Sequence, residues 1–287
     1  SNDDLISALK RMMERKTLNK KIVEIIKNVN NGNGNVNDST ADVKDSADNN
    51  QQIIDIAKAA ILKLIWKDES QTGLFCGKHA INNLFKEELV YSDYGQRTVS
   101  DVNKNRLIGL MASYTGGSGY SDNLTRTLKD IMGNPPYNMD YLCELLNIYM
   151  YNPSVNTDKY SNPKEEIHDC KESGNYSIGV IMAALQLIGT KRNYKVDELR
   201  MSSTEHIDII NKIDDNLIGF VVLMGSYHYV SIRRTTNGFE IIDSMESRDP
   251  VNIGSSSFTE SISINYTTYG NNVNFLRLNK NTNDNDN

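Results

Sequence analysis

One of the three cysteines, Cys76, has the sequence surroundings of a reactive thiol. Gly73 breaks the chain ahead of it. Apolar residues then recur at helical spacing, at Ala80, Ile81, Leu84 and Phe85. Cys76 therefore falls in the first turn of a predicted helix, where unpaired N–H groups and the helix dipole favour the thiolate, the reactive form. A buried structural cysteine is the more common case, so these local features leave both interpretations open.

A nucleophilic cysteine needs a base, and His228 is the histidine best placed to supply one. His79 lies one turn after the cysteine on the same predicted helix, while His168 and His206 lie in charged segments. His228 instead opens a predicted strand, YHYVSIRR, and Asp243 ends the next strand, FEIID. Asp243 is therefore the candidate to orient the base.

The turn between these two strands decides whether the two side chains can meet. A two-residue turn at Asn237-Gly238 leaves them too far apart, and a three-residue loop puts them on opposite faces of the sheet. A four-residue loop, Thr235–Gly238, pairs Val230 with Asp243. His228 is then the diagonal neighbour on the same face, within side-chain reach. A surface histidine and a strand-end aspartate are the alternative.

Gln71 precedes the cysteine by five residues and is a candidate oxyanion donor. Its amide group, together with the backbone N–H of Cys76, can stabilise the negative oxygen of a tetrahedral intermediate. A glutamine in a loop is more often simply solvated, so this assignment depends on the other motifs.

Three segments of the chain resemble the three motifs of Josephin domains, in the family's order. The segment Gln71–Leu84 looks like the opening motif, with its glutamine, cysteine, histidine and paired asparagines at the family's spacing. Gly174–Gln186 closely resembles the second motif, and Tyr227–Val230 followed by Phe239–Ser244 is similar to the third. Each motif alone is weak, but the three together are specific.

The resemblance implies an α+β, papain-like cysteine protease fold, with a helical lobe and a mostly antiparallel sheet lobe. It implies Cys76 as nucleophile, His228 as general base, Asp243 as orienting group and Gln71 as oxyanion donor. The implied activity is deubiquitination: hydrolysis of isopeptide or peptide bonds after the ubiquitin C-terminus through an acyl-enzyme. The implied partners are ubiquitin or polyubiquitin conjugates, and no cofactor is needed.

The order of predicted elements also favours the α+β class. Helical patterns come first, at 5–29, 53–65, Leu124–Met132, Met139–Tyr149 and 178–188. From residue 217 the period changes to two, which predicts strands at Leu217–Met224, Tyr227–Arg233, Phe239–Asp243, Ser261–Tyr266 and Val273–Leu278.

Polar segments divide the chain and account for its low hydrophobic share of 38%. Residues 30–50 are rich in Asn, Gly, Asp and Ser, which predicts a flexible linker after an N-terminal helical extension, 1–29. The catalytic domain is expected at 51–278, followed by a disordered tail at 279–287. Its insert at about 86–172 is longer than in the family, which usually places there a helical arm that contacts ubiquitin.

Residues 1–65 have no counterpart in the family's catalytic core. They are interpreted as an accessory helix, a second ubiquitin-binding element or an inhibitory arm, with a helix that simply packs on the core as the plainest alternative.

Composition narrows the partners and the compartment. The formal net charge of −6 disfavours nucleic acid, and no apolar run is long enough to span a membrane. The first residues carry no secretory signal, and three cysteines suit a reducing compartment. We therefore expect an intracellular monomer, in the cytoplasm or nucleus of a eukaryote or of the host of a virus or bacterium. Cys143 and Cys170 are expected to be free thiols and, with His168, lack the fourth ligand of a zinc site.

Two other functions remain open at this stage. A protease of the same fold that cleaves a ubiquitin-like modifier or a viral polyprotein would use identical chemistry. A ubiquitin-binding module with little catalysis is the second alternative, and the presence of all four catalytic residue types argues against it.

Overall fold

The computed structural model describes residues 75–93, 98–112, 122–150, 170, 176–226, 228–245, 250–254 and 257–281. These residues all fall in one of two units of the chain, Lys67–Asn287. The predicted N-terminal extension, the linker and Gln71 lie outside the described residues.

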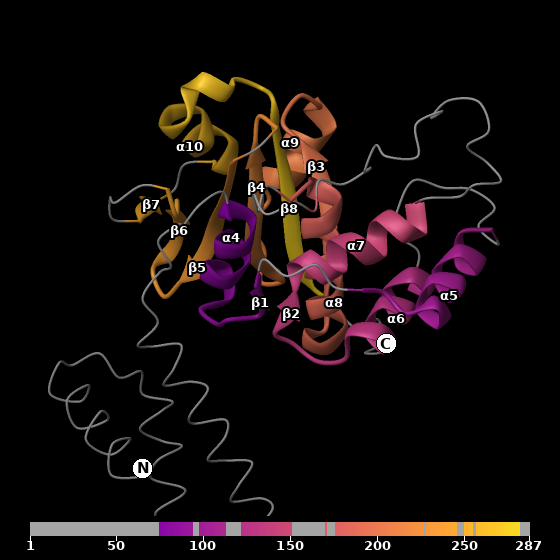
Figure 1. Ribbon diagram of the computed structural model, residues 1–287. Helices are drawn as coiled ribbons and strands as arrows, with labels where there is room; N and C mark the ends of the chain where they lie inside the picture. Colours follow the sequence, from indigo (N-terminus) through magenta and orange to yellow (C-terminus); the bar gives the residue numbers. More distant parts are fainter. Residues whose placement is uncertain are drawn as a thin grey trace, which may run out of the picture. The chain divides into compact units, whose positions relative to one another are not determined.

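Helices precede a mostly antiparallel sheet, as the sequence predicts (Figure 1). The first helices are α4 (Cys76–Phe85), α5 (Asp101–Ala112), α6 (Asp122–Met132), α7 (Met139–Met150) and α8 (Ile178–Arg192). Two more, α9 (Thr204–Asn211) and α10 (Phe258–Asn265), and the 3-10 turn η1 (Thr267–Tyr269) lie between strands. Among the described residues, no helix is long and apolar enough to cross a membrane.

The main sheet has six strands, each antiparallel to its neighbours. In spatial order they are β3 (Tyr194–Arg200), β8 (Val273–Lys280), β4 (Leu217–Met224), β5 (His228–Thr235), β6 (Gly238–Ile242) and β7 (Val251–Ile253). A short parallel pair, β1 (Val90–Tyr91) and β2 (Tyr137–Asn138), lies apart from this sheet. Strand β8 continues through Lys280 and so includes the first two residues of the predicted tail.

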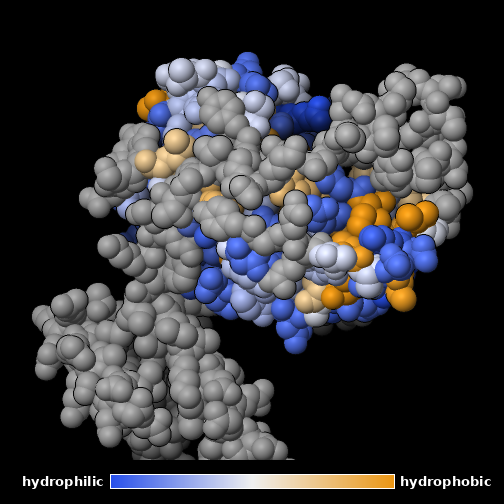
Figure 2. All heavy atoms as spheres, viewed as in Figure 1, coloured by the Kyte–Doolittle hydropathy of each residue, from blue (hydrophilic) through white to orange (hydrophobic). Residues whose placement is uncertain are grey.

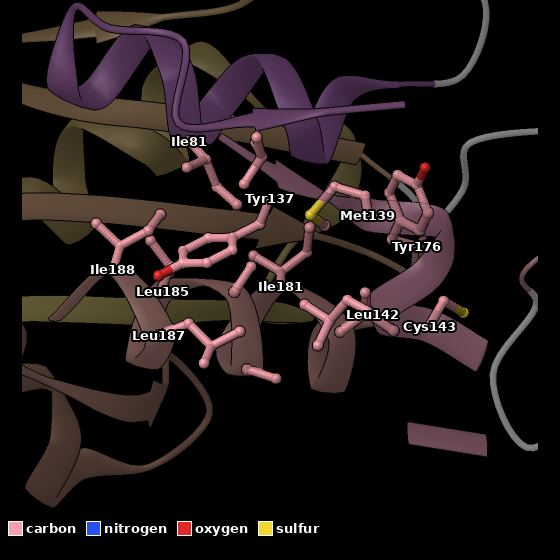
Figure 3. Packing of buried hydrophobic residues seen from close by; sticks show 14 of the residues in the cluster. Ile81, Tyr137, Met139, Leu142, Cys143, Tyr176, Ile181, Leu185, Leu187 and Ile188 are labelled. Carbon is pink, nitrogen blue, oxygen red and sulfur yellow. The ribbon is translucent and has the colours of Figure 1, made fainter. Parts of the chain in front are cut away.

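Both faces of the sheet are buried, and alternate residues of β4 show it. Val221 and Leu223 belong to the core shared with α4, α7 and α8, whereas Phe220 and Val222 belong to the core shared with α10. Figure 3 shows the first core, where the ring of Tyr137 lies among apolar side chains of α8. The central strands are therefore held from both sides, which fixes the positions of the residues that they carry.

The paired asparagines of the opening motif have structural roles. The side chain of Asn82 accepts hydrogen bonds from the N–H groups of Leu89 (2.9 Å) and Val90 (3.1 Å) and donates to the Val90 carbonyl (3.0 Å). The carbonyl of Asn83 accepts from Arg233 Nη1 on β5 at 3.0 Å. Together they tie α4 to β1 and to the main sheet.

A glycine lets α4 approach its neighbours closely. A Cβ atom at Gly77 would lie 2.6 Å from Ile181 Cδ1 on α8 and 3.3 Å from Tyr229 Cδ2 on β5. A larger residue would push the first turn of α4, and Cys76 with it, away from the sheet.

The predicted strand at Ser261–Tyr266 is wrong, because these residues end helix α10 and its C-cap. The hydroxyl of Ser257 caps this helix by accepting a hydrogen bond from the N–H of Glu260 at 3.1 Å. Ser257 and Glu260 have the spacing of a capping box, a sequence signal that the alternating isoleucines obscured. Phe258 and Ile262, four residues apart, form the buried face of the helix.

The prediction that Cys143 and Cys170 are free thiols is also wrong. The structure joins them in a disulfide across 27 residues of sequence, and Cys76 is the free cysteine of the chain. Cys143 is fully buried in the first core. The number of cysteines did not indicate this pairing, because the pairing depends on how α7 and the segment before α8 meet in space.

Reduction of this disulfide should lower the free energy of unfolding by about 3–4 kcal/mol, because the bond closes a loop of 27 residues in the unfolded chain. Urea denaturation with and without a phosphine reductant measures the change. The variant Cys76→Ser should respond to reductant as the wild type does, and the double variant Cys143→Ala/Cys170→Ala should not respond. Equal unfolding midpoints of the wild type in both conditions would contradict the prediction.

Candidate active site

The register of β5 on β6 brings His228 and Asp243 together. Thr235 pairs with Gly238, so the turn itself holds only Thr236-Asn237. The strands have the register that the four-residue loop Thr235–Gly238 would give, although the turn itself is two residues long. The alternative two-residue turn at Asn237-Gly238, which would separate His228 from Asp243, is wrong.

The carboxylate of Asp243 is fixed by three donors. His228 Nε2 lies 3.0 Å from Oδ2, and the hydroxyl of Tyr266 donates to the same oxygen at 3.0 Å. The backbone N–H of Met245 donates to Oδ1, also at 3.0 Å. The side chains of His228 and Asp243 are only 4% and 6% exposed, so solvent screens their interaction little.

Opposing effects set the charge of this pair. Burial lowers the pKa of His228, but the hydrogen bonds and negative charges of Asp243 and Cys76 outweigh burial and raise it to about 9. Burial raises the pKa of Asp243, but its contacts with His228, Met245 and Tyr266 outweigh burial and lower it. At neutral pH the pair is therefore an imidazolium beside a carboxylate.

Cys76 is a second partner of the imidazole. It is the first residue of α4, is 2% exposed, and interacts with His228 strongly enough to raise the pKa of the histidine. Because Nε2 is occupied by Asp243, Nδ1 is the ring nitrogen left for the sulfur. Among the described residues, Nδ1 is buried without a partner at full hydrogen-bond geometry, which leaves it for a contact with the thiol. Such contacts often tighten only when substrate binds.

The structure therefore brings together three of the four residues singled out in the sequence. Gln71 lies outside the described residues, and its role stays a prediction. His79 is buried in the core beside the site, and Nδ1 of His206 accepts a hydrogen bond from the N–H of Arg200 at 2.9 Å, on β3. Within the part of the chain that the structure describes, no group of three His, Cys, Asp or Glu side chains can hold a metal.

Sequence reasoning missed Tyr266 as a partner of the site. Its segment was interpreted as a strand, which gave its hydroxyl no particular target. The capping box that begins α10 predicts a helix ending near Tyr266, but only the fold shows that this helix end lies beside Asp243.

Comparison with known proteins gives a family. The Josephin family model matches residues 71–269, more than half of the chain. The chain belongs to the Josephin family. Josephin domains are ubiquitin-related cysteine proteases, and the helices and antiparallel sheet of this chain are consistent with their papain-like α+β fold. No curated protein matches the chain.

The matched region contains all four residues proposed from the sequence, including Gln71 at its first position. It also contains α5 to α7, which belong to the segment that the sequence predicts to be longer than in the family.

Replacing Asp243 by Asn should lower the pKa of His228 from about 9 toward or below its ordinary value of 6.5, because burial then opposes the imidazolium without the carboxylate. Titration of the His228 ring signal by NMR measures this. In the wild type the imidazolium, and its contribution to folding, is complete below about pH 6.5 and is lost as the pH rises through about 9.

The exposed Asp208 on α9 offers a matched control, and Asp208→Asn should leave the His228 titration unchanged. A His228 pKa near 6.5 in the wild type, or one that Asp243→Asn does not move, would contradict the geometry described for this pair.

Proposed function

We propose that this chain is a thiol-dependent deubiquitinase that hydrolyses isopeptide or peptide bonds after the C-terminal glycine of ubiquitin. The observation that carries the proposal is the buried imidazolium–carboxylate pair of His228 and Asp243 beside Cys76, in a chain of the Josephin family. Cys76 is assigned as nucleophile, His228 as general acid and base, and Asp243 as the orienting group.

In the first step, the sulfur of Cys76 bonds to the carbonyl carbon of the ubiquitin C-terminal glycine. The imidazolium of His228 and the N-terminus of α4 both favour the thiolate that makes this attack. His228 then gives its proton to the departing amine as the C–N bond breaks, which leaves an acyl-enzyme.

Water completes the cycle. The neutral imidazole of His228 takes a proton from a water molecule whose oxygen attacks the thioester carbon. The C–S bond then breaks, which releases the ubiquitin C-terminus as a carboxylic acid that loses its proton to solvent, and restores the thiolate–imidazolium pair. In both steps negative charge develops on the carbonyl oxygen, where Gln71 and the N–H of Cys76 are assigned as donors.

Asp243 contributes by holding the ring rather than by accepting a proton. Three donors fix its carboxylate, and its hydrogen bond to Nε2 leaves Nδ1 for the sulfur and the leaving group. Its charge also keeps His228 protonated at neutral pH, which supplies the acid needed in the first step.

The long segment between α4 and α8 is assigned to substrate binding. Figure 2, viewed as in Figure 1, shows apolar side chains gathered over α5 and α6. On α5, Val102 is 77% exposed, and on α6, Ile131 and Met132 are half-buried. Apolar helix faces of this kind commonly dock protein partners, and ubiquitin is the partner that we assign to it. We also assign the protein to the interior of a cell, where ubiquitin conjugates are found.

A ubiquitin that carries an electrophile at its C-terminus should form a covalent adduct with the full chain, detected as a mass increase of one ubiquitin. The adduct should be absent in Cys76→Ala and should form about 10²- to 10³-fold more slowly in His228→Ala, which lacks the imidazolium. The same assay with ubiquitin-like modifiers tests the alternative substrate class.

Cys143→Ala/Cys170→Ala is the matched control, because it removes the two disulfide-bonded cysteines and leaves Cys76, so the adduct should still form. A folded wild-type protein that forms no adduct with ubiquitin would refute the proposed function. An adduct with another modifier in its place would assign the chain to that substrate.

A further inference from the structure

A series of buried hydrogen bonds connects β5 to the start of α7. The hydroxyl of Tyr229 donates to the backbone carbonyl of Tyr176 at 3.1 Å. The hydroxyl of Tyr176 donates to Asp140 Oδ1 at 2.6 Å, and Ser92 Oγ donates to Asp140 Oδ2 at 2.6 Å. Both tyrosines are 1% exposed and Asp140 is 7% exposed.

Both tyrosines touch the segment that presents Cys76. The rings of Phe75 and Tyr176 lie 6.3 Å apart between centroids, and the ring of Tyr229 packs against Gly77. Burial raises the pKa of Tyr229, and the negative charge of Cys76 raises it further, so this hydroxyl lies within the electrostatic reach of the sulfur. Tyr229 also follows His228 directly in β5.

Asp140 lies at the end of this series of hydrogen bonds. Among the described residues, no Lys, Arg or His lies within 4 Å of its carboxylate, which accepts hydrogen bonds from the hydroxyls of Ser92 and Tyr176. Its place in the first turn of α7 offsets part of its charge. A buried carboxylate without a cation is costly, so its short bond to a tyrosine that lies against the segment of Cys76 is a reason for it to be there.

The same turn of α7 holds the chain before α8 at a second point. Cys143, three residues after Asp140, forms the disulfide with Cys170, six residues before Tyr176. The start of α7 is therefore anchored to the segment before α8 both covalently and through a hydrogen bond. This makes α7 a rigid support for Tyr176.

We propose that Asp140 and Tyr176 are positioning residues for the reaction of Cys76. They act through Tyr229 and Phe75, which keep the imidazole of His228 and the first turn of α4 at their working separation. Since a misplacement of about 1 Å can cost about 10²-fold in rate, the loss of one hydroxyl in this series of hydrogen bonds should be visible in turnover. The proposal rests on the proposed deubiquitinase function.

The test compares two tyrosines that each lose a buried hydroxyl bond. Tyr176→Phe keeps the ring against Phe75 but releases Asp140. Tyr194→Phe is the matched control, since the Tyr194 hydroxyl donates to the Leu185 carbonyl at 3.0 Å in the same core. Its ring stacks on Phe85, at the opposite end of α4 from Cys76. Thermal melting should show a similar loss of stability in both variants.

Turnover of a fluorogenic ubiquitin amide should distinguish Tyr176→Phe from Tyr194→Phe. In Tyr176→Phe, kcat should fall about 10-fold with KM unchanged, and in Tyr194→Phe both should stay within twofold of the wild type. Asp140→Asn should lower kcat as Tyr176→Phe does, and the double variant should lose little more, because the two side chains act as one unit. Equal effects of Tyr176→Phe and Tyr194→Phe on kcat would overturn the proposal.

Alkylation of Cys76 by iodoacetamide gives a second readout that needs no ubiquitin. The rate, followed by mass spectrometry, should fall several-fold in Tyr176→Phe and stay unchanged in Tyr194→Phe. If the wild type turned over no ubiquitin amide but Tyr176→Phe still slowed alkylation, the proposed function would fail while the positioning role stood. An unchanged alkylation rate in Tyr176→Phe would overturn the positioning role.

Discussion

The pairing of β5 with β6 is the constraint on which the site depends. A slip of one residue would turn Asp243 to the opposite face of the sheet and leave His228 buried without its carboxylate. Arg233 holds this register, because its guanidinium contacts Glu240 across the two strands. The same guanidinium donates to the carbonyl of Asn83, near the end of α4. One buried arginine thus links the strand pair that carries the histidine and aspartate to the helix that begins at Cys76.

The cost of burying charge explains why so many neighbours surround this pair. Burial alone would lower the pKa of His228 and raise the pKa of Asp243. Each group instead keeps its charge because of the other, and Tyr266 and the Met245 N–H complete the carboxylate's hydrogen bonds. A sheet covered on both faces holds these partners in place. The proposed catalysis and the stability of the fold therefore depend on the same contacts.

Much of the scaffold is visible in the sequence, because period and turn geometry are local. The alternating strands near β4 and β5 and the helical pattern of α8 follow from short stretches of residues, whereas the turn sequence left three registers open at Asp243. The strand expected at Ser261–Tyr266 failed because alternating isoleucines matched a strand while the capping box at Ser257 set a helix. The Cys143–Cys170 disulfide and the contacts of Tyr266 and Tyr176 join segments that are far apart in the chain. No local sequence pattern therefore predicts them.

The central claim is that Asp243 acts on the reaction only through His228. A double-mutant cycle on the turnover of a fluorogenic ubiquitin amide tests it most directly, with Asp243→Asn, His228→Ala and the double variant. The account predicts that Asp243→Asn lowers kcat/KM by about 10²- to 10⁴-fold when His228 is present, and changes it by less than about twofold when His228 is replaced. Losses that multiply in the double variant would contradict the account, because they would give the aspartate a role apart from the histidine.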